Sequence, residues 1–169
     1  MLSSRSDVVV RSAKLADAGR LAVVFETAWR NAYAGIIPHD SLEAILRRRN
    51  GTWWRSQIRS GEMILVLELA GKIGGYATGG AARSRGRHQG EIYELYLEPT
   101  YQGLGLGEHL FEACRSRFDQ RRLKGLIVWA LADNAGAIDF YERRGGRQVA
   151  KVNERFGRVK LEKLALGWS

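Results

Sequence analysis

The sequence predicts a mixed α/β fold, in which a central, mostly antiparallel twisted sheet of about six or seven strands carries helices on both faces. The predicted elements run in the order strand, several helices, three strands, helix, strand, helix and two strands. The hydrophobic and charged fractions, 45% and 27%, are typical of a globular protein. A chain of 169 residues is expected to form one domain, residues 1–169, with a sizeable core.

The amino-terminal half combines one strand, a run of helices and a hairpin. Apolar residues at helical spacing predict a helix over Leu15–Tyr33, after a short strand at Val8–Arg11. Asp17 lies in the first turn of this helix, but Lys14 stands where a capping Ser or Thr would be usual. The other elements expected here are helices over Ser41–Arg49, ended by Asn50-Gly51, and Thr52–Arg59, and strands over Met63–Leu69 and Ile73–Ala82.

The carboxy-terminal half alternates strands with helices. Cys114 falls on the apolar stripe of a predicted helix, which indicates a small core residue and not a nucleophile. The unbroken apolar run Leu126–Ala130 indicates a strand buried on both faces. The expected elements are a strand at Glu91–Leu97, helices over Leu106–Gln120 and Asn134–Arg144, and a final antiparallel pair, Arg147–Phe156 and Arg158–Leu166.

The formal charge of +9 attracts anionic partners in general, but the basic residues are scattered in small groups. A solubilising surface therefore explains them at least as well as a specific patch. The longest apolar run, Met63–Leu67, is too short to cross a membrane, and residues 1–7 lack the apolar core of a signal peptide. The single cysteine excludes an internal disulfide framework. A cytoplasmic protein is expected.

The stretch Glu91–Gly107 joins a strand to the start of a helix through three glycines at alternate positions, Gly103, Gly105 and Gly107. The free backbone N–H groups of a helix N-terminus bind anions such as phosphate. A P-loop is excluded because Gly107 is followed by Glu108 and not by Lys with Ser or Thr. The dinucleotide pattern also fails, because the glycine spacing is wrong and an antiparallel meander precedes it.

Two motifs resemble those of the GNAT superfamily of acyl-CoA N-acyltransferases. The first is Gln102-x-x-Gly105-x-Gly107 behind a strand that ends Leu-Tyr-Leu-Glu-Pro. The second runs from Asn134 to Gly145 as Asn-x-x-Ala-x-x-Phe-Tyr-Glu-x-x-Gly, with Tyr141 seven residues after Asn134. The stretch Ala28–Pro38 also resembles the start of many bacterial members. In one departure, Gly145 is followed by Gly146 where the family usually has an aromatic residue, so a core contact is expected to be lost or replaced.

This resemblance implies a sheet that splays after its fourth strand and acetyl-CoA as co-substrate, with no metal. The pyrophosphate of the coenzyme would bind at the glycine turn, and its peptide-like pantetheine arm would pair with the backbone of Leu95 and Leu97, as an added strand does. The residues implied to bind acetyl-CoA are Leu95, Tyr96, Leu97, Gln102, Gly103, Leu104, Gly105, Leu106, Gly107, Asn134 and Tyr141.

The expected reaction is direct acetyl transfer, in a ternary complex, to a primary amine of a small molecule, amino acid or peptide. In the family the tyrosine that matches Tyr141 protonates the departing thiolate. Glu91 and Glu94 are alternative general bases that would act directly or through a water. Strand alternation predicts that Glu94 faces away from Glu91, Leu95 and Leu97.

The acceptor side is less defined by the sequence. Trp29 and Tyr33, with Trp53, Trp54 and the loop Arg83–Gly90, are candidates for acceptor contact, although core packing is the better reading for Trp29. The alternatives to an enzyme are a non-catalytic acyl-CoA sensor or a nucleic-acid-binding module with a GNAT-like fold; incidental hydrolysis of acyl-CoA is a weaker one. Nucleic acid is disfavoured because no stacking motif is present. A homodimer and a monomer both remain open.

Overall fold

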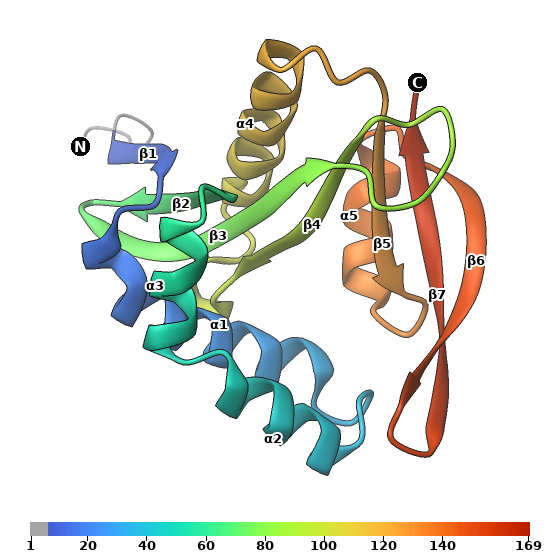
Figure 1. The fold of residues 1–169 in the computed structure, drawn as a ribbon, viewed down its shortest axis with the longest axis horizontal. Helices are drawn as coiled ribbons and strands as arrows, with labels where there is room; N and C mark the ends of the chain where they lie inside the picture. Colours follow the sequence, from blue (N-terminus) through green and yellow to red (C-terminus); the bar gives the residue numbers. More distant parts are fainter. Residues whose placement is uncertain (1–6) are drawn as a thin grey trace.

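The computed structural model describes residues 7–169 and contains a seven-stranded sheet in the order β1-β2-β3-β4-β5-β7-β6 (Figure 1). Its strands are antiparallel except for the β4–β5 pair, which is parallel. The predicted order of elements is confirmed. The elements are β1 (Val8–Ser12), α1 (Ala18–Tyr33), α2 (His39–Arg48), α3 (Gly51–Arg59), β2 (Met63–Leu69), β3 (Lys72–Ala81), β4 (Gly90–Leu97), α4 (Leu106–Gln120), β5 (Leu126–Leu131), α5 (Ala135–Arg143), β6 (Arg147–Phe156) and β7 (Val159–Trp168).

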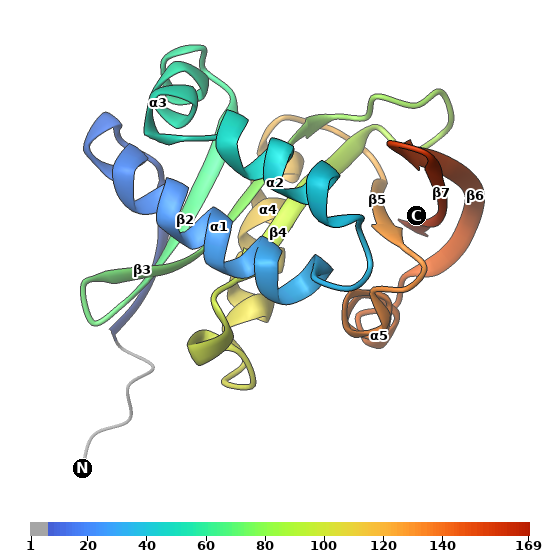
Figure 2. The same cartoon turned by 90° about the horizontal axis from the view of Figure 1, so that it is seen from below.

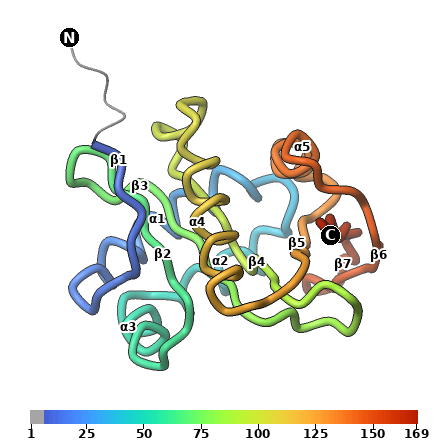
Figure 3. Tube along the Cα trace, turned by 90° about the horizontal axis from the view of Figure 1, so that it is seen from above, coloured from blue at the N-terminus to red at the C-terminus, as the bar shows by residue number. Residues whose placement is uncertain are grey.

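Helices cover both faces of the sheet, as the sequence predicts. Figures 2 and 3 view the molecule from opposite sides, with α1 and α2 nearest the viewer in Figure 2 and α4 in Figure 3. The core is correspondingly divided into two clusters of buried side chains. One contains Leu110, Cys114 and Phe118 of α4 with one face of the sheet, and α5 packs against it. The other joins α1, α2 and α3 to the opposite face, around Phe25 and Trp54.

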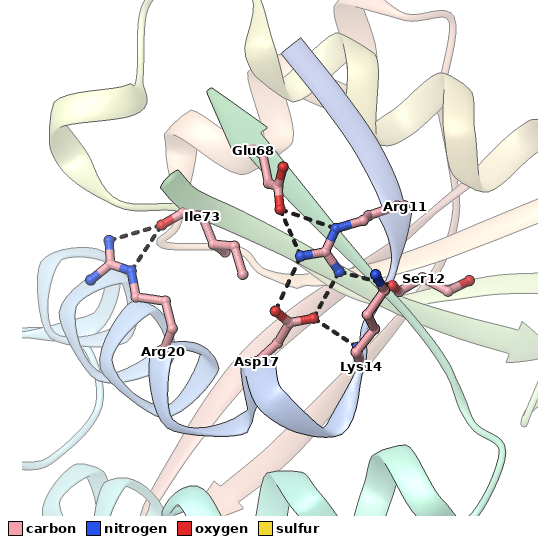
Figure 4. Close-up of polar contacts among 7 residues, drawn as sticks. All are labelled: Arg11, Ser12, Lys14, Asp17, Arg20, Glu68 and Ile73. Atoms are coloured by element: carbon pink, nitrogen blue, oxygen red, sulfur yellow. Dashed lines mark hydrogen bonds and ion pairs between the residues drawn. The ribbon is translucent and has the colours of Figure 1, made fainter. Parts of the chain in front are cut away.

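Arg11 ties the first strand to the start of α1 (Figure 4). Its guanidinium donates to Glu68 on β2 at 2.6 Å and to Asp17 at 2.8 Å. Asp17 also accepts from the backbone N–H of Lys14 at 2.7 Å, within a short 3-10 turn (Leu15–Asp17) that precedes α1. Asp17 thus pairs with the backbone N–H of Lys14 before the 3-10 turn, although its side chain makes no capping bond to α1 itself.

Asn50 corrects one predicted boundary. The pair Asn50-Gly51 was expected to end the helix before it, but Asn50 is the N-cap of α3. Its side chain accepts from the backbone N–H of Trp53 at 3.0 Å. An Asn-Gly pair is compatible with the end of a helix, because glycine readily adopts the left-handed conformation found there. It is equally compatible with the start of a helix, because asparagine is a preferred N-cap residue.

β4 and β5 separate after a short parallel contact, as the splayed sheet predicts (Figure 1). Their pairing covers three positions and ends at Ile92 and Val128. Beyond that point β5 continues to pair with β7 through Leu131, whereas β4 continues along β3 through Leu97. Over the second half of β4, the edge that faces β5 therefore forms no pairs with β5.

A β-bulge at Tyr93 overturns the predicted alternation of β4. Gly79 pairs with Ile92 and Thr78 with Glu94, so Tyr93 is an extra residue in β4. As a result Ile92 and Leu95 both pack in the α4 cluster, although they are three residues apart. Glu94 does face away from Leu95, as predicted. Glu91 and Glu94 were predicted to lie on opposite faces of the sheet, and this prediction is wrong. The extra residue between them places both side chains on the same face.

Within residues 7–169, no helix is both long and apolar enough to span a membrane.

Candidate active site

A cleft of about 830 Å³ opens where β4 and β5 separate. It is bounded by the second half of β4, the glycine turn, the start of α4, the inner face of α5 and the end of α1. The sequence-predicted residues that line it are Leu95, Tyr96, Leu97, Gln102, Gly103, Gly105, Leu106, Gly107, Asn134 and Tyr141. Segments more than 40 residues apart in the chain, from Leu95 to Tyr141, are thus brought to one cavity. Leu104 is not part of the lining; its side chain is 62% exposed on the outside of the turn.

The free edge of β4 presents backbone groups to this cleft. The N–H of Glu98 donates to Gly74 O at 2.9 Å, so this position faces β3. Since successive residues of a strand point their backbone groups in opposite directions, Leu95 and Leu97 face the open side. In agreement, the Gln102 amide donates to the carbonyl of Leu97 at 3.1 Å. Leu95 and the N–H of Leu97 therefore remain available for an extended, peptide-like ligand.

The glycine turn presents the N-terminus of α4 at one end of the cleft. Gly103 and Gly105 have φ angles of +78° and +76°, which L-residues rarely adopt. Gly107 is required for a different reason: a Cβ there would lie 2.9 Å from the ring of Phe140 on α5. The turn thus combines free N–H groups of a first helical turn with a close contact between α4 and α5.

Asn134 and Tyr141 lie on the side of α5 that lines the cleft. Asn134 is the N-cap of this helix, and its side-chain oxygen accepts from the N–H of Ala137 at 3.3 Å. That bond uses the amide oxygen, so the NH₂ group, which also lies against the Tyr33 hydroxyl, has two N–H bonds to donate. Tyr141 is 5% exposed among Phe111, Phe140 and Trp168. Burial raises the pKa of Tyr141 well above its usual value, so the phenol is a neutral proton donor across the physiological range.

Glu94 is held by Arg49 on the other side of β4. Arg49 Nη1 and Nη2 donate to its two carboxylate oxygens at 2.7 and 2.8 Å, and the Tyr76 hydroxyl donates to it at 2.7 Å. Glu94 nevertheless borders a cavity of about 190 Å³ that Trp53 and Arg83 also line. Its carboxylate can therefore still contact a water or a substrate.

Glu91 is more deeply enclosed. Its side chain is 1% exposed, and it accepts from the backbone N–H of Arg83 at 2.9 Å and from the Arg83 guanidinium at 2.6 Å. Both oxygens thus bind Arg83, near the start of the loop between β3 and β4. Of the two predicted bases, Glu94 lines the cavity of about 190 Å³, and Glu91 lines neither this cavity nor the cleft.

Comparisons with known proteins agree with this geometry. Residues 24–146 match the Acetyltransferase (GNAT) family. The chain belongs to this family. It is 32% identical over 162 residues to the uncharacterized N-acetyltransferase YuaI of Bacillus subtilis (strain 168), covering 95% of this chain and 92% of YuaI. The GNAT fold is also found in solved structures.

One such structure is the ribosomal-protein-alanine N-acetyltransferase of Brucella melitensis, with a TM-score of 0.72, 27% identity and coverage of 95% of this chain and 98% of that one. Another is the PaiA N-acetyltransferase of Thermoplasma acidophilum in complex with coenzyme A, with a TM-score of 0.74, 17% identity and coverage of 92% and 97%. This GNAT protein is accordingly an acetyltransferase with acetyl-CoA as co-substrate, and no group of three metal-ligating side chains occurs within residues 7–169.

The aromatic residues proposed for the acceptor side lie mainly in the core of this GNAT domain. Trp54 is fully buried and Tyr33 is 5% exposed, with its hydroxyl hydrogen-bonded to that of Tyr96. Trp29 donates to the Tyr76 hydroxyl at 3.1 Å, which supports its predicted packing role. Trp53 is the exception, because it borders the cavity beside Glu94.

Trp168 replaces the aromatic residue that the second GNAT motif lacks. A Cβ on Gly146 would lie 2.7 Å from the Trp168 ring, which occupies the space beneath α5. The indole N–H donates to the carbonyl of Arg144 at 2.9 Å, and the ring packs on Phe111 and Tyr141. The expected core contact is therefore supplied by the end of β7.

Sequence reasoning missed Arg49, which it counted among the scattered basic groups. Arg49 lies within 6 Å of the ring centres of Phe25, Trp29, Trp53 and Trp54. A signal was present, since Leu42, Leu46 and Arg49 follow each other at the spacing of one helical face, and the two leucines are buried. Tyr76 was also missed, as nothing in its glycine-rich strand distinguishes it from a core residue.

Proposed function

We propose that this GNAT protein transfers an acetyl group directly from acetyl-CoA to a primary amine in a ternary complex. The observation that carries the proposal is the position of Tyr141, a buried phenol on the cleft that opens where β4 and β5 separate. Direct transfer requires that the amine reach the bound thioester. The separation of the two strands allows this, because the cleft is lined by α4 and α5 on one face of the sheet and by the end of α1 on the other, the face on which Glu94 lies.

The donor would be held by backbone groups and by α5. The N–H groups at the start of α4 suit a pyrophosphate, and the open edge of Leu95 and Leu97 suits the pantetheine amides. The amide NH₂ of Asn134 has two N–H bonds, and the one not directed at Tyr33 would donate to the same arm. Bound in this way, acetyl-CoA supplies a thioester, and the remaining work of the protein is to position the amine and move two protons.

Tyr141 would give a proton to the departing thiolate. Its raised pKa keeps the hydroxyl protonated at neutral pH, so it can donate a hydrogen bond, and then its proton, as negative charge develops on the sulfur. Glu94 would receive the proton of the amine through a water in the adjoining cavity, because its carboxylate borders that cavity whereas Glu91 is 1% exposed. Glu91 instead would hold the β3–β4 loop through Arg83.

The test is acetyl-CoA titration by calorimetry, followed by measurement of thiol release with a panel of amines. Tyr141→Phe should lower kcat on the order of 10²-fold with little change in acetyl-CoA affinity, since general acid catalysis contributes about that much. Unchanged turnover in that variant would remove Tyr141 from the mechanism. Tight coenzyme binding without amine-dependent thiol release would instead support a sensor.

A further inference from the structure

A further cavity lies on the acceptor face of the sheet, beneath the loop between β3 and β4. It has a volume of about 430 Å³, in the range of small-molecule sites. The loop supplies Arg85, Arg87 and His88 to its lining, and β5 supplies Ile127 and Trp129. Two guanidinium groups, an imidazole and an indole thus line one cavity, and Lys163 Nζ lies 5.3 Å from the centre of the Trp129 ring.

This cavity is located next to the proposed transfer point. Val128 forms the last β5 pair with β4, so Trp129 is the first residue of β5 after the strands separate. Val128 packs in the α4 cluster, whereas Leu131 packs with α1, α2 and α3. By strand alternation Trp129 shares the face of Leu131. The cavity therefore opens on the side opposite α4, where an acceptor would approach.

The loop that roofs this cavity is anchored at both ends. Ala82 donates to Gln89 O and Gln89 donates to Lys124 O, each at 2.8 Å. The buried Glu91 holds the backbone and side chain of Arg83. At the far end the His88 ring lies close to β7, because a Cβ on Gly167 would come within 2.7 Å of His88 Nε2. These contacts anchor the segment whose Arg85 and Arg87 line the same cavity as Trp129.

The charges around this cavity are not balanced. Arg85 and Arg87 form no ion pair within residues 7–169, whereas the nearby carboxylates of Glu91 and Glu94 are already neutralised by Arg83 and Arg49. The donor cleft is different, since its two arginines are paired: Arg143 with Asp139 at 2.9 Å and Arg144 with Glu108 at 2.6 Å. Of these two cavities, the one beneath the β3–β4 loop therefore carries the arginines without a carboxylate partner.

We propose that the acceptor is a small amine that also carries an anionic group, a carboxylate or a phosphate, and that Arg85 and Arg87 bind this group above Trp129. The proposal rests on the amine acetylation proposed above. Guanidinium groups bind carboxylates and phosphates through paired, charge-assisted hydrogen bonds. The same cations disfavour a protonated amine nearby, so they also favour the neutral form that attacks a thioester.

The experiment compares matched acceptors with and without the anionic group. 4-Aminobutyrate is paired with 4-aminobutyramide, and O-phosphoethanolamine with ethanolamine, so that the carboxylate and the phosphate are tested separately. Acetylation and calorimetric binding in the presence of coenzyme A are measured for the wild type, for Arg85→Ala/Arg87→Ala and for Arg55→Ala/Arg59→Ala. The last variant removes the same charge from α3, at exposed residues that line none of the cavities described above.

We expect Arg85→Ala/Arg87→Ala to raise KM for the preferred anionic acceptor on the order of 10- to 100-fold, with unchanged KM for its neutral partner and for acetyl-CoA. The α3 control should match the wild type. Equal use of anionic and neutral acceptors would overturn this proposal while leaving acetylation intact. Binding of an anionic amine that depends on Arg85 and Arg87, without acetyl transfer, would support the anionic site and refute the acetylation.

Discussion

Arg49 and Glu94 form a bidentate ion pair at 2.7 and 2.8 Å that joins the end of α2 to the bulged part of β4. The Arg49 and Glu94 side chains are only 10% and 18% exposed, and the guanidinium lies 4.1 Å from the ring centre of Phe25 and 4.2 Å from that of Trp53. The pair therefore fixes the proposed base relative to the α1–α3 layer. It also connects the proposed chemistry to the stability of this layer.

Removing the charge of Glu94 should both destabilise the protein and lower its kcat. Glu94→Gln leaves the Arg49 guanidinium partly buried without its counter-ion, which should lower the free energy of unfolding by about 2–3 kcal/mol, below the ~3–5 kcal/mol of a fully buried pair. Urea denaturation measures this loss. Arg48→Ala, at an exposed neighbour on α2, is the control and should change stability by less than about 0.5 kcal/mol. A kcat equal to the wild type in Glu94→Gln would exclude this carboxylate as the base.

The order of elements could be predicted because it depends on local patterns, whereas the cleft was implied by the resemblance of two motifs to the GNAT superfamily. Glycines with positive φ, an asparagine cap and apolar periodicity are visible residue by residue. The orientation of Glu91 was not predictable, because it depends on an extra residue, Tyr93, in the pairing of β4 with β3. The roles of Arg49 and Trp168 likewise arise from contacts between elements far apart in the chain.

Asp17 should make stability depend on pH in the acidic range. The Arg11 guanidinium lowers the pKa of Asp17 below 3.8, so its contribution is complete above that value and is lost as pH falls through the lower pKa of the folded state. At pH 7 Asp17→Asn should cost about 1–2 kcal/mol. Unfolding free energies measured from pH 7 to pH 2.5 should show the two proteins converging at the acidic end. A difference that does not change with pH would contradict this account.

Gly107 should be more sensitive to substitution than another helical glycine. Its Cβ in Gly107→Ala would lie 2.9 Å from Phe140, so α5 would have to shift away from α4 and carry Asn134 and Tyr141 with it. We expect a loss of acetyl-CoA affinity on the order of 10-fold, measured by calorimetry. Gly19→Ala on α1, where nothing lies within 4 Å, is the matched control and should be neutral or stabilising. Equal affinity in both variants would refute the proposed close contact.

Trp168 should contribute the stability that, in other members of the family, comes from the aromatic residue of the second motif. Trp168→Phe keeps a ring under α5 but loses the indole hydrogen bond to Arg144 O, which should cost about 1 kcal/mol. Trp168→Ala opens a cavity beside Gly146 and Tyr141 and should cost about 3–5 kcal/mol. Since Tyr141 rests on this ring, Trp168→Ala should also lower kcat at a temperature where the variant is still folded. Comparing the decrease in kcat between Trp168→Ala and Trp168→Phe measures how much the end of β7 contributes to positioning Tyr141. A Trp168→Ala protein as stable as the wild type would show that Gly146 leaves no space that needs filling.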